Sequence, residues 1–221
     1  MSVAICTPSY DGTFGSAYTL GLVALAAHRE FAMPYLVSYC SNVALARNKC
    51  VHWFLSTEYE HLVFIDADMG YSRTDWQYLM EDDGSEGVCC EYRKKDQVRK
   101  IRVQYGLGFA RISRRLLEQM ALLEREAGGD LLQRFRSEGE EWIDYFPQGV
   151  VTGDTWRGED HGFWLMARLT GLAIRLERRT ELMHTGVAHW RYQAADFPDE
   201  LSPFADAAAP TPAVLPDPTG I

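Results

Sequence analysis

The chain has 221 residues, enough for one sizeable α/β domain or two small ones, and 47% of its residues are hydrophobic and 12% aromatic, a composition that excludes a disordered chain. Its net charge of −9 argues against general nucleic-acid binding, and no run approaches the roughly 18 apolar residues of a membrane-spanning helix. The first residues lack the basic and apolar regions of a secretory signal, and the five cysteines include no C-x-x-C pair, so we expect a cytoplasmic protein with reduced thiols.

Up to residue 92, strand-like and helix-like segments alternate along the chain. Short apolar runs typical of strands occupy residues 3–7, 34–39, 62–65 and 87–92. Apolar residues recur with helical spacing over residues 15–29, 42–56 and 73–81, and Ser41 or Asn42 is a suitable N-cap for the second helix. This alternation predicts βαβ units, a mostly parallel central sheet flanked by helices, and strand ends that share one rim.

The pattern after residue 92 is less regular. Gly106 and Gly108 open a further strand-like run, and residues 114–125 form an amphipathic helix. We expect irregular structure over residues 130–150 with 145–147 extended, a helix at 162–170, a short strand at 172–176, and a loop that holds His184 and His189. These segments complete one domain over residues 1–191.

Charge is distributed unevenly along the chain. Residues 192–221 hold six of the nine prolines and five acidic residues without any Lys or Arg, which predicts an extended Pro/Ala-rich tail that is packed on the core or on a partner, or disordered. Residues 93–115 hold nine of the 22 Lys and Arg residues, a pattern that fits a patch for an anionic ligand or a solvated loop.

Two carboxylates follow the most apolar strand. The run Leu62–Ile65 leads directly into Asp66 and Asp68, although aspartate is disfavoured within a buried strand. Carboxylates at this spacing can share a hard cation such as Mg²⁺ or Mn²⁺, whose remaining ligands are often substrate phosphates. The alternative is a turn in which Asp only satisfies backbone groups. Because strand ends share one rim, the loop from Thr7 to Tyr10 should face the same cleft.

Several short motifs follow one another in a defined order. They are Cys6-Thr7-Pro8-Ser9-Tyr10, Asn42 with Ala46-Arg47-Asn48, Phe64-Ile65-Asp66-Ala67-Asp68-Met69, Gly106-Leu107-Gly108-Phe109, Gly158-Glu159-Asp160 and Met183-His184-Thr185-Gly186. This set, which covers about residues 1–190, resembles the GT-A glycosyltransferases, in particular compact family-2-like bacterial and viral members. The chain departs from the processive members of that family because it has no strong QxxRW-like segment and no transmembrane anchor.

The resemblance implies a single Rossmann-like GT-A domain that transfers a sugar from a nucleotide-sugar donor to an acceptor hydroxyl with Mn²⁺ or Mg²⁺ as cofactor. It also implies a role for each matching residue. Toward the donor, Thr7, Pro8 and Tyr10 would line the nucleotide pocket, Arg47 would hold the nucleotide or its phosphates, and Gly108 would border the sugar. Asp66 would contact the ribose or the metal, Asp68 and His184 would bind the metal, and Glu159 and Asp160 would occupy the position of the base in inverting members. A retaining member would not need that base. A viral origin would place the protein in the host cytoplasm.

Elementary chemistry agrees with these implied roles and also offers alternatives. An acceptor hydroxyl must lose its proton to a nearby carboxylate, and a helix start should favour the ionised form of Asp160. The alternatives are that Glu159 and Asp160 only cap the helix, that His184 is a packed or surface histidine, and that Arg47 is a solvated helix residue.

Three functions compete on the sequence. The first is glycosyl transfer to a glycan, a small molecule or, as a minority hypothesis, a hydroxymethylated base of phage-type DNA, for which Trp142, Tyr145, Trp156 or Trp164 would supply a stacking ring. The second is sugar-phosphate nucleotidyl transfer, which a Gly-rich basic loop after the first strand would support; residues 8–12 contain no basic residue. The third is a non-catalytic module that binds a nucleotide sugar.

Overall fold

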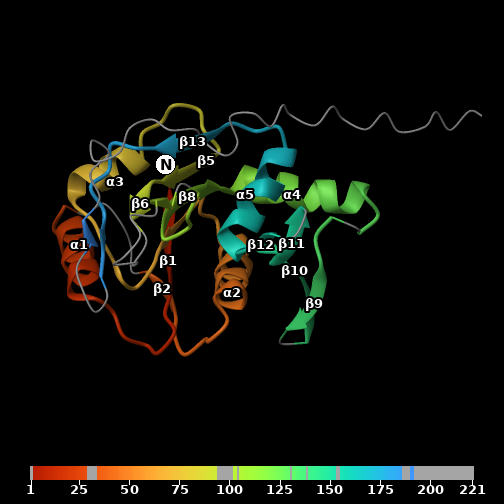
Figure 1. Cartoon of the computed structure of the whole chain (residues 1–221), viewed down its shortest axis with the longest axis horizontal. Helices are drawn as coiled ribbons and strands as arrows, with labels where there is room; N and C mark the ends of the chain where they lie inside the picture. The colour runs from red at the N-terminus through yellow and green to blue at the C-terminus, as the bar shows by residue number, and fades with distance from the viewer. Residues whose placement is uncertain are drawn as a thin grey trace, which may run out of the picture.

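A six-stranded sheet forms the centre of the computed structural model (Figure 1). Its strands, in spatial order, are β13 (Ile174–Glu177), β5 (Gly87–Cys90), β8 (Phe109–Ser113), β3 (His61–Ile65), β1 (Val3–Pro8) and β2 (Tyr35–Val37). Five strands are parallel, and β8 runs antiparallel between β3 and β5. The prediction of a mostly parallel sheet is therefore confirmed. The structure describes residues 2–28, 34–93, 102–103, 105–129, 131–137, 139–152, 155–185 and 190–191, so the predicted tail at 192–221 lies outside it.

Helices cover both faces of this sheet, as Figure 1 shows. Helices α1 (Ser16–Ala27) and α3 (Arg73–Leu79) lie on one face, and α2 (Val43–Leu55), α4 (Arg114–Glu126) and α5 (Glu159–Leu169) on the other. Asn42 caps α2 by accepting from the Leu45 amide at 3.1 Å, and Ser113 caps α4 by accepting from the Leu116 amide at 3.0 Å. Each cap satisfies a backbone donor that the helix itself leaves open.

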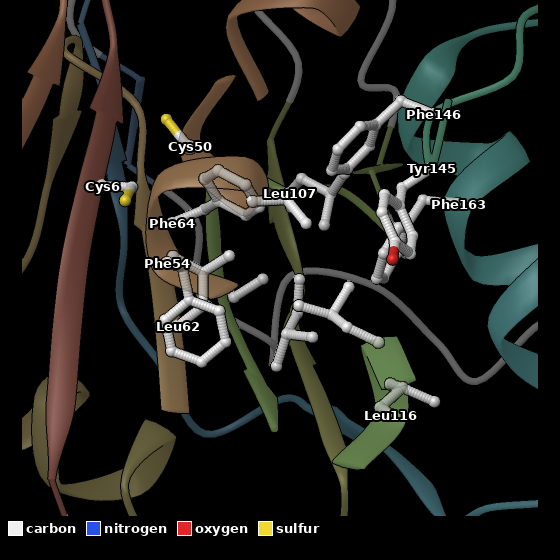
Figure 2. Close-up of a cluster of buried hydrophobic side chains, with 14 of the residues drawn as sticks. Cys6, Cys50, Phe54, Leu62, Phe64, Leu107, Leu116, Tyr145, Phe146 and Phe163 are labelled. Carbon is white, nitrogen blue, oxygen red and sulfur yellow. The ribbon is translucent and has the colours of Figure 1, made fainter. Parts of the chain in front are cut away.

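Two hydrophobic clusters fill the space between the layers. In β3, Leu62 and Phe64 point into the cluster under α2, α4 and α5, whereas Val63 and Ile65 point into the cluster under α1 and α3. This alternation explains why the run is apolar at every position. Figure 2 shows the first cluster, in which Phe54, Phe64, Phe146 and Phe163 are fully buried. Burial of each such ring contributes about 1.5–3 kcal/mol.

Smaller sheets surround the central one. They are β14 (Met183–His184) between β4 (Met69–Gly70) and β15 (Trp190–Arg191), β6 (Tyr92–Arg93) with β7 (Arg102–Val103), β9 (Arg134–Ser137) with β10 (Glu140–Ile143), and β11 (Gly149–Thr152) with β12 (Thr155–Arg157). No helix within the described ranges is both long and apolar enough to cross a bilayer.

The smaller sheets correct several sequence-based expectations. Residues 134–143 form a hairpin instead of irregular structure, because Phe135 and Trp142 pair across the two strands with ring centroids 5.8 Å apart. His184 belongs to β14, where it pairs with Met69, and does not lie in a loop. The last predicted helix begins at Glu159, three residues earlier than expected, and Gly171, with φ of 70°, follows its end.

Candidate functional site

A cleft of about 600 Å³ opens where β1 and β3 end. Its wall is formed by the loop after β1, the start of α2 and the turn that follows β3. Asp11, Asp66 and Asp68 contribute carboxylates to this wall, and the described lining includes no Lys or Arg. The volume lies within the usual range of small-molecule sites.

The loop after β1 divides its residues between the cleft and the core. Pro8 and Tyr10 line the cleft, and the Tyr10 side chain is 72% exposed. Thr7 is fully buried instead, and its Oγ1 lies 2.7 Å from the hydroxyl of Tyr18 on α1. Thr7 therefore supports the loop from behind, while Pro8 and Tyr10 are available to a ligand.

Backbone hydrogen bonds hold the turn from Asp66 to Met69 in place. The Asp66 amide donates to the Gly108 carbonyl at 2.9 Å, and the Gly15 amide donates to the Ala67 carbonyl at 2.7 Å. Thr185 donates to the Asp68 carbonyl through both its amide and its hydroxyl, each at 2.8 Å. Because segments from three parts of the chain fix this turn, the Asp66 and Asp68 side chains start from a defined position at the cleft.

Arg47 connects the acids of two distant segments. It is only 3% exposed; its Nη2 donates to Asp66 Oδ1 at 2.9 Å and Oδ2 at 3.1 Å, and its Nη1 donates to Glu159 Oε1 at 2.5 Å. Burial alone would lower the pKa of Arg47, but the charges of Asp66 and Glu159 outweigh it and raise that pKa. The alternative of a solvated helix residue is wrong, because this guanidinium is buried and fully charged.

Glu159 and Asp160 both lie in the first turn of α5. The N-cap of this helix is Gly158, and Asp160 Oδ1 accepts from the His161 amide at 2.8 Å. Burial raises the pKa of Asp160, and the charge of Glu159 raises it further, against the opposing effect of Arg47. The helix start does favour the ionised form of Asp160 through the His161 amide, as expected, but burial and the neighbouring acid outweigh this effect and the net pKa is raised.

Tyr92 belongs to this region although the sequence did not suggest it. Its buried ring meets His184 edge-on at 5.5 Å, and its hydroxyl accepts a long hydrogen bond from the Gly108 amide at 3.4 Å. A Cβ at Gly106 would lie 2.2 Å from this hydroxyl, and one at Gly108 would lie 3.0 Å from it. The two glycines thus make room for Tyr92. Gly108 also adjoins Asp66, since its added Cβ would lie 3.0 Å from Asp66 Oδ2.

The acids and His184 fit a metal ion only in part. Asp68 Oδ1 and His184 Nε2 lie 3.5 Å apart, whereas Asp66 directs both carboxylate oxygens at Arg47. No group of three His, Cys, Asp or Glu side chains that could hold a metal occurs in the part of the chain that the structure describes. Two protein ligands are enough for a hard divalent cation when phosphates and water complete its shell. Gly186 and His189 lie outside the described residues.

Three arginines of the basic stretch have side-chain contacts away from the cleft. Arg111 donates to the Ser85 carbonyl, Arg114 donates to carbonyls between Phe54 and Tyr59, and Arg115 pairs with Glu86, all toward the opposite end of the sheet. Residues 94–101 lie outside the described ranges. Three of the candidate stacking rings, Trp142, Tyr145 and Trp164, are buried in the core, and the Trp156 side chain is not described.

Comparisons with known proteins address the fold of this chain. No protein-family model and no curated protein matches the sequence. Among solved structures, A197 from STIV is similar with a TM-score of 0.51 and 20% identity, over 84% of this chain and 86% of that chain. A glycosyltransferase involved in the glycosylation of the major capsid of PBCV-1 has a TM-score of 0.37 and 10% identity, over 57% of this chain and 68% of that chain. The likeness to A197 shows a shared α/β fold.

Proposed function

We propose that this chain is a metal-dependent glycosyltransferase that moves a sugar from a nucleotide-sugar donor to an acceptor hydroxyl. The observation that carries the proposal is the position of Arg47, which joins Asp66 at the cleft to Glu159 in the first turn of α5. This link brings a strand-end acid pair and a helix-start acid pair into one site. Such a site offers separate groups for binding a diphosphate and for accepting a proton.

Charge argues for a cation between the cleft and its ligand. A nucleoside diphosphate is strongly anionic, and the described lining of the cleft offers three carboxylates without Lys or Arg. In this proposal, Asp68 and His184, which lie 3.5 Å apart, would hold Mn²⁺ or Mg²⁺, with Asp66 adjacent. The bound ion would neutralise charge that develops on the departing diphosphate. Pro8 and Tyr10 border the space for the nucleoside, and the start of α2 lies beside it.

The two acids of α5 have different roles in this proposal. Arg47 holds Glu159, which suits it to orient the helix start, while Asp160 has no ion pair of this kind among the described contacts. Burial makes Asp160 a stronger base when it is ionised, because its proton affinity is raised. In an inverting displacement, the acceptor oxygen attacks the anomeric carbon, the bond to the diphosphate breaks, and the acceptor proton passes to Asp160.

The decisive experiment separates binding from transfer. Thermal unfolding is followed with UDP, GDP, CDP and TDP and their sugars, with and without Mn²⁺, and nucleoside diphosphate release is then measured for any donor that binds. We expect one nucleotide class to raise the melting temperature only with Mn²⁺. Asp68→Ala should abolish this shift. The control Asp82→Ala, which removes an exposed acid outside the cleft, should preserve it.

Other outcomes would assign another function. A folded protein whose stability responds to no nucleotide would contradict the donor site. Donor binding without release of nucleoside diphosphate, across a broad panel of acceptors, would instead indicate a binding module. Release of pyrophosphate from a nucleoside triphosphate and a sugar phosphate would indicate nucleotidyl transfer.

A further inference from the structure

Asn48 follows Arg47 on α2 and uses both ends of its amide. The side chain is 4% exposed; its Nδ2 donates to Asp144 Oδ1 at 2.7 Å, and its Oδ1 accepts from the Tyr145 amide at 3.0 Å. Asp144 Oδ1 also accepts from the Phe146 amide at 2.9 Å. One buried residue of α2 therefore fixes the segment that follows β10.

The segment fixed by Asn48 packs against the first turns of α5. The Phe146 ring stacks on Phe163 at 5.2 Å and meets Phe64 edge-on at 5.9 Å; Figure 2 shows these three side chains in one cluster. The Pro147 carbonyl is so close to Gly162 that an added Cβ would lie 1.9 Å from its oxygen. Gly162 is the fourth residue of α5, one turn after Glu159. The segment therefore contacts the helix just behind its two acids.

We propose that Asn48 and Asp144 form a positioning pair that sets the orientation of the acids on α5; this inference rests on the proposed function. Arg47 contacts the first turn of α5 through Glu159, and the buried Phe163 and Trp164 pack the helix into the core. Asn48 adds a second contact one helical turn away, through residues 144–147 and Gly162. Two adjacent residues of α2 thus act together on the first turns of the helix that carries Asp160, in addition to its packing in the core.

The chemistry of the pair favours a positioning role over simple filling of the core. A buried amide and a partly buried carboxylate lose hydration on folding, and an apolar pair would avoid that loss. Hydrogen bonds at fixed angles give direction, which apolar contacts do not. Asn48 satisfies Asp144 and the Tyr145 amide together, so its loss affects the whole segment and not one contact.

The test compares Asn48→Ala with Ser72→Ala, which removes the N-cap of α3 on the opposite face of the sheet. Hydrogen exchange of the full chain is followed over residues 159–163, and kcat and KM are measured with the donor identified above. We expect Asn48→Ala to speed exchange there about tenfold, as loss of a buried hydrogen-bond partner predicts. We also expect kcat to fall about tenfold or more with little change in donor KM, and Ser72→Ala to affect neither quantity.

A second pair of variants removes any dependence on the alanine variant. Asn48→Asp places two carboxylates against each other and should speed hydrogen exchange at residues 159–163. Combining it with Asp144→Asn restores a donor and an acceptor and should return the exchange rate to within about twofold of that of the natural chain. Failure of this rescue, or equal exchange at 159–163 in Asn48→Ala and Ser72→Ala, would overturn the positioning pair. If exchange responds as expected but the natural chain turns over no donor, the proposed function fails and the positioning role stands.

Discussion

Replacing Arg47 with methionine tests the centre of the proposed site. The variant keeps a long apolar side chain and removes the guanidinium, which lies over the Phe64 ring and is shared by Asp66 and Glu159. Loss of one partner from a fully buried ion pair costs about 3–5 kcal/mol. The two carboxylates are 25% and 18% exposed, so water recovers part of that cost and we expect a loss of about 3 kcal/mol. For a chain of this size the melting temperature should fall by about 6–12 °C.

The assay is urea unfolding followed by circular dichroism, with Arg114→Met as the matched control. Arg114 also lies over a phenylalanine ring, Phe54, and donates to four backbone carbonyls at the far end of the sheet. Both variants should lose stability, but only Arg47→Met should also lose the Mn²⁺-dependent response to nucleotide. An Arg47→Met protein that unfolds within about 1 kcal/mol of the natural chain and binds nucleotide normally would refute the central role of Arg47.

Three further predictions concern neighbouring groups. Tyr92→Phe keeps the ring against His184 and removes the hydroxyl that accepts from the Gly108 amide, so urea unfolding should show a loss of stability of about 1 kcal/mol. The control is Tyr71→Phe, which should lose no stability because its buried hydroxyl has no hydrogen-bond partner among the described contacts. Asp160→Asn should be more stable than the natural chain at pH 7, because the pKa of Asp160 is higher in the folded chain than in the unfolded chain and ionisation therefore costs stability. Unfolding at a series of pH values should show this advantage shrink as the pH falls toward the ordinary pKa of an aspartate. Gly106→Ala places a methyl group 2.2 Å from the Tyr92 hydroxyl and should destabilise the chain by about 1–3 kcal/mol, measured in the same way; full stability would mean that Tyr92 moves aside freely.

Local sequence signals predicted the elements that carry the cleft. The unbroken apolar run of β3 marks a strand buried on both faces, and Asn42 marks the start of α2, because these features depend on neighbours in the chain. Contacts over long separations were not predictable in this way. Arg47 pairs with Glu159, 112 residues away, and nothing near Arg47 reveals that partner.

The remaining misses have specific physical causes. Strand direction is not encoded in an apolar run, so the antiparallel course of β8 was not foreseen. The resemblance implied a place for Gly108 at the site, but the entry of Tyr92 at the rim where β3 ends was not foreseen. In the hairpin at 134–143, charged residues such as Arg134 and Glu141 obscure the paired aromatic residues. The proton affinity of Asp160 depends on burial, which follows from the packing of α5 and not from its place in a helix.

The consecutive placement of Arg47 and Asn48 has a consequence for changes of chain length. One residue inserted between the Asn42 cap and Arg47 would rotate both side chains by about 100° around α2 and shift them by about 1.5 Å along it. The link to Glu159 and the link to Asp144 would then be lost together. The tip of the β9–β10 hairpin, by contrast, is closed by a ladder of fixed register, so insertions there leave the site untouched. Related chains that share this site should therefore vary in length at that tip and keep a constant spacing within the first turns of α2.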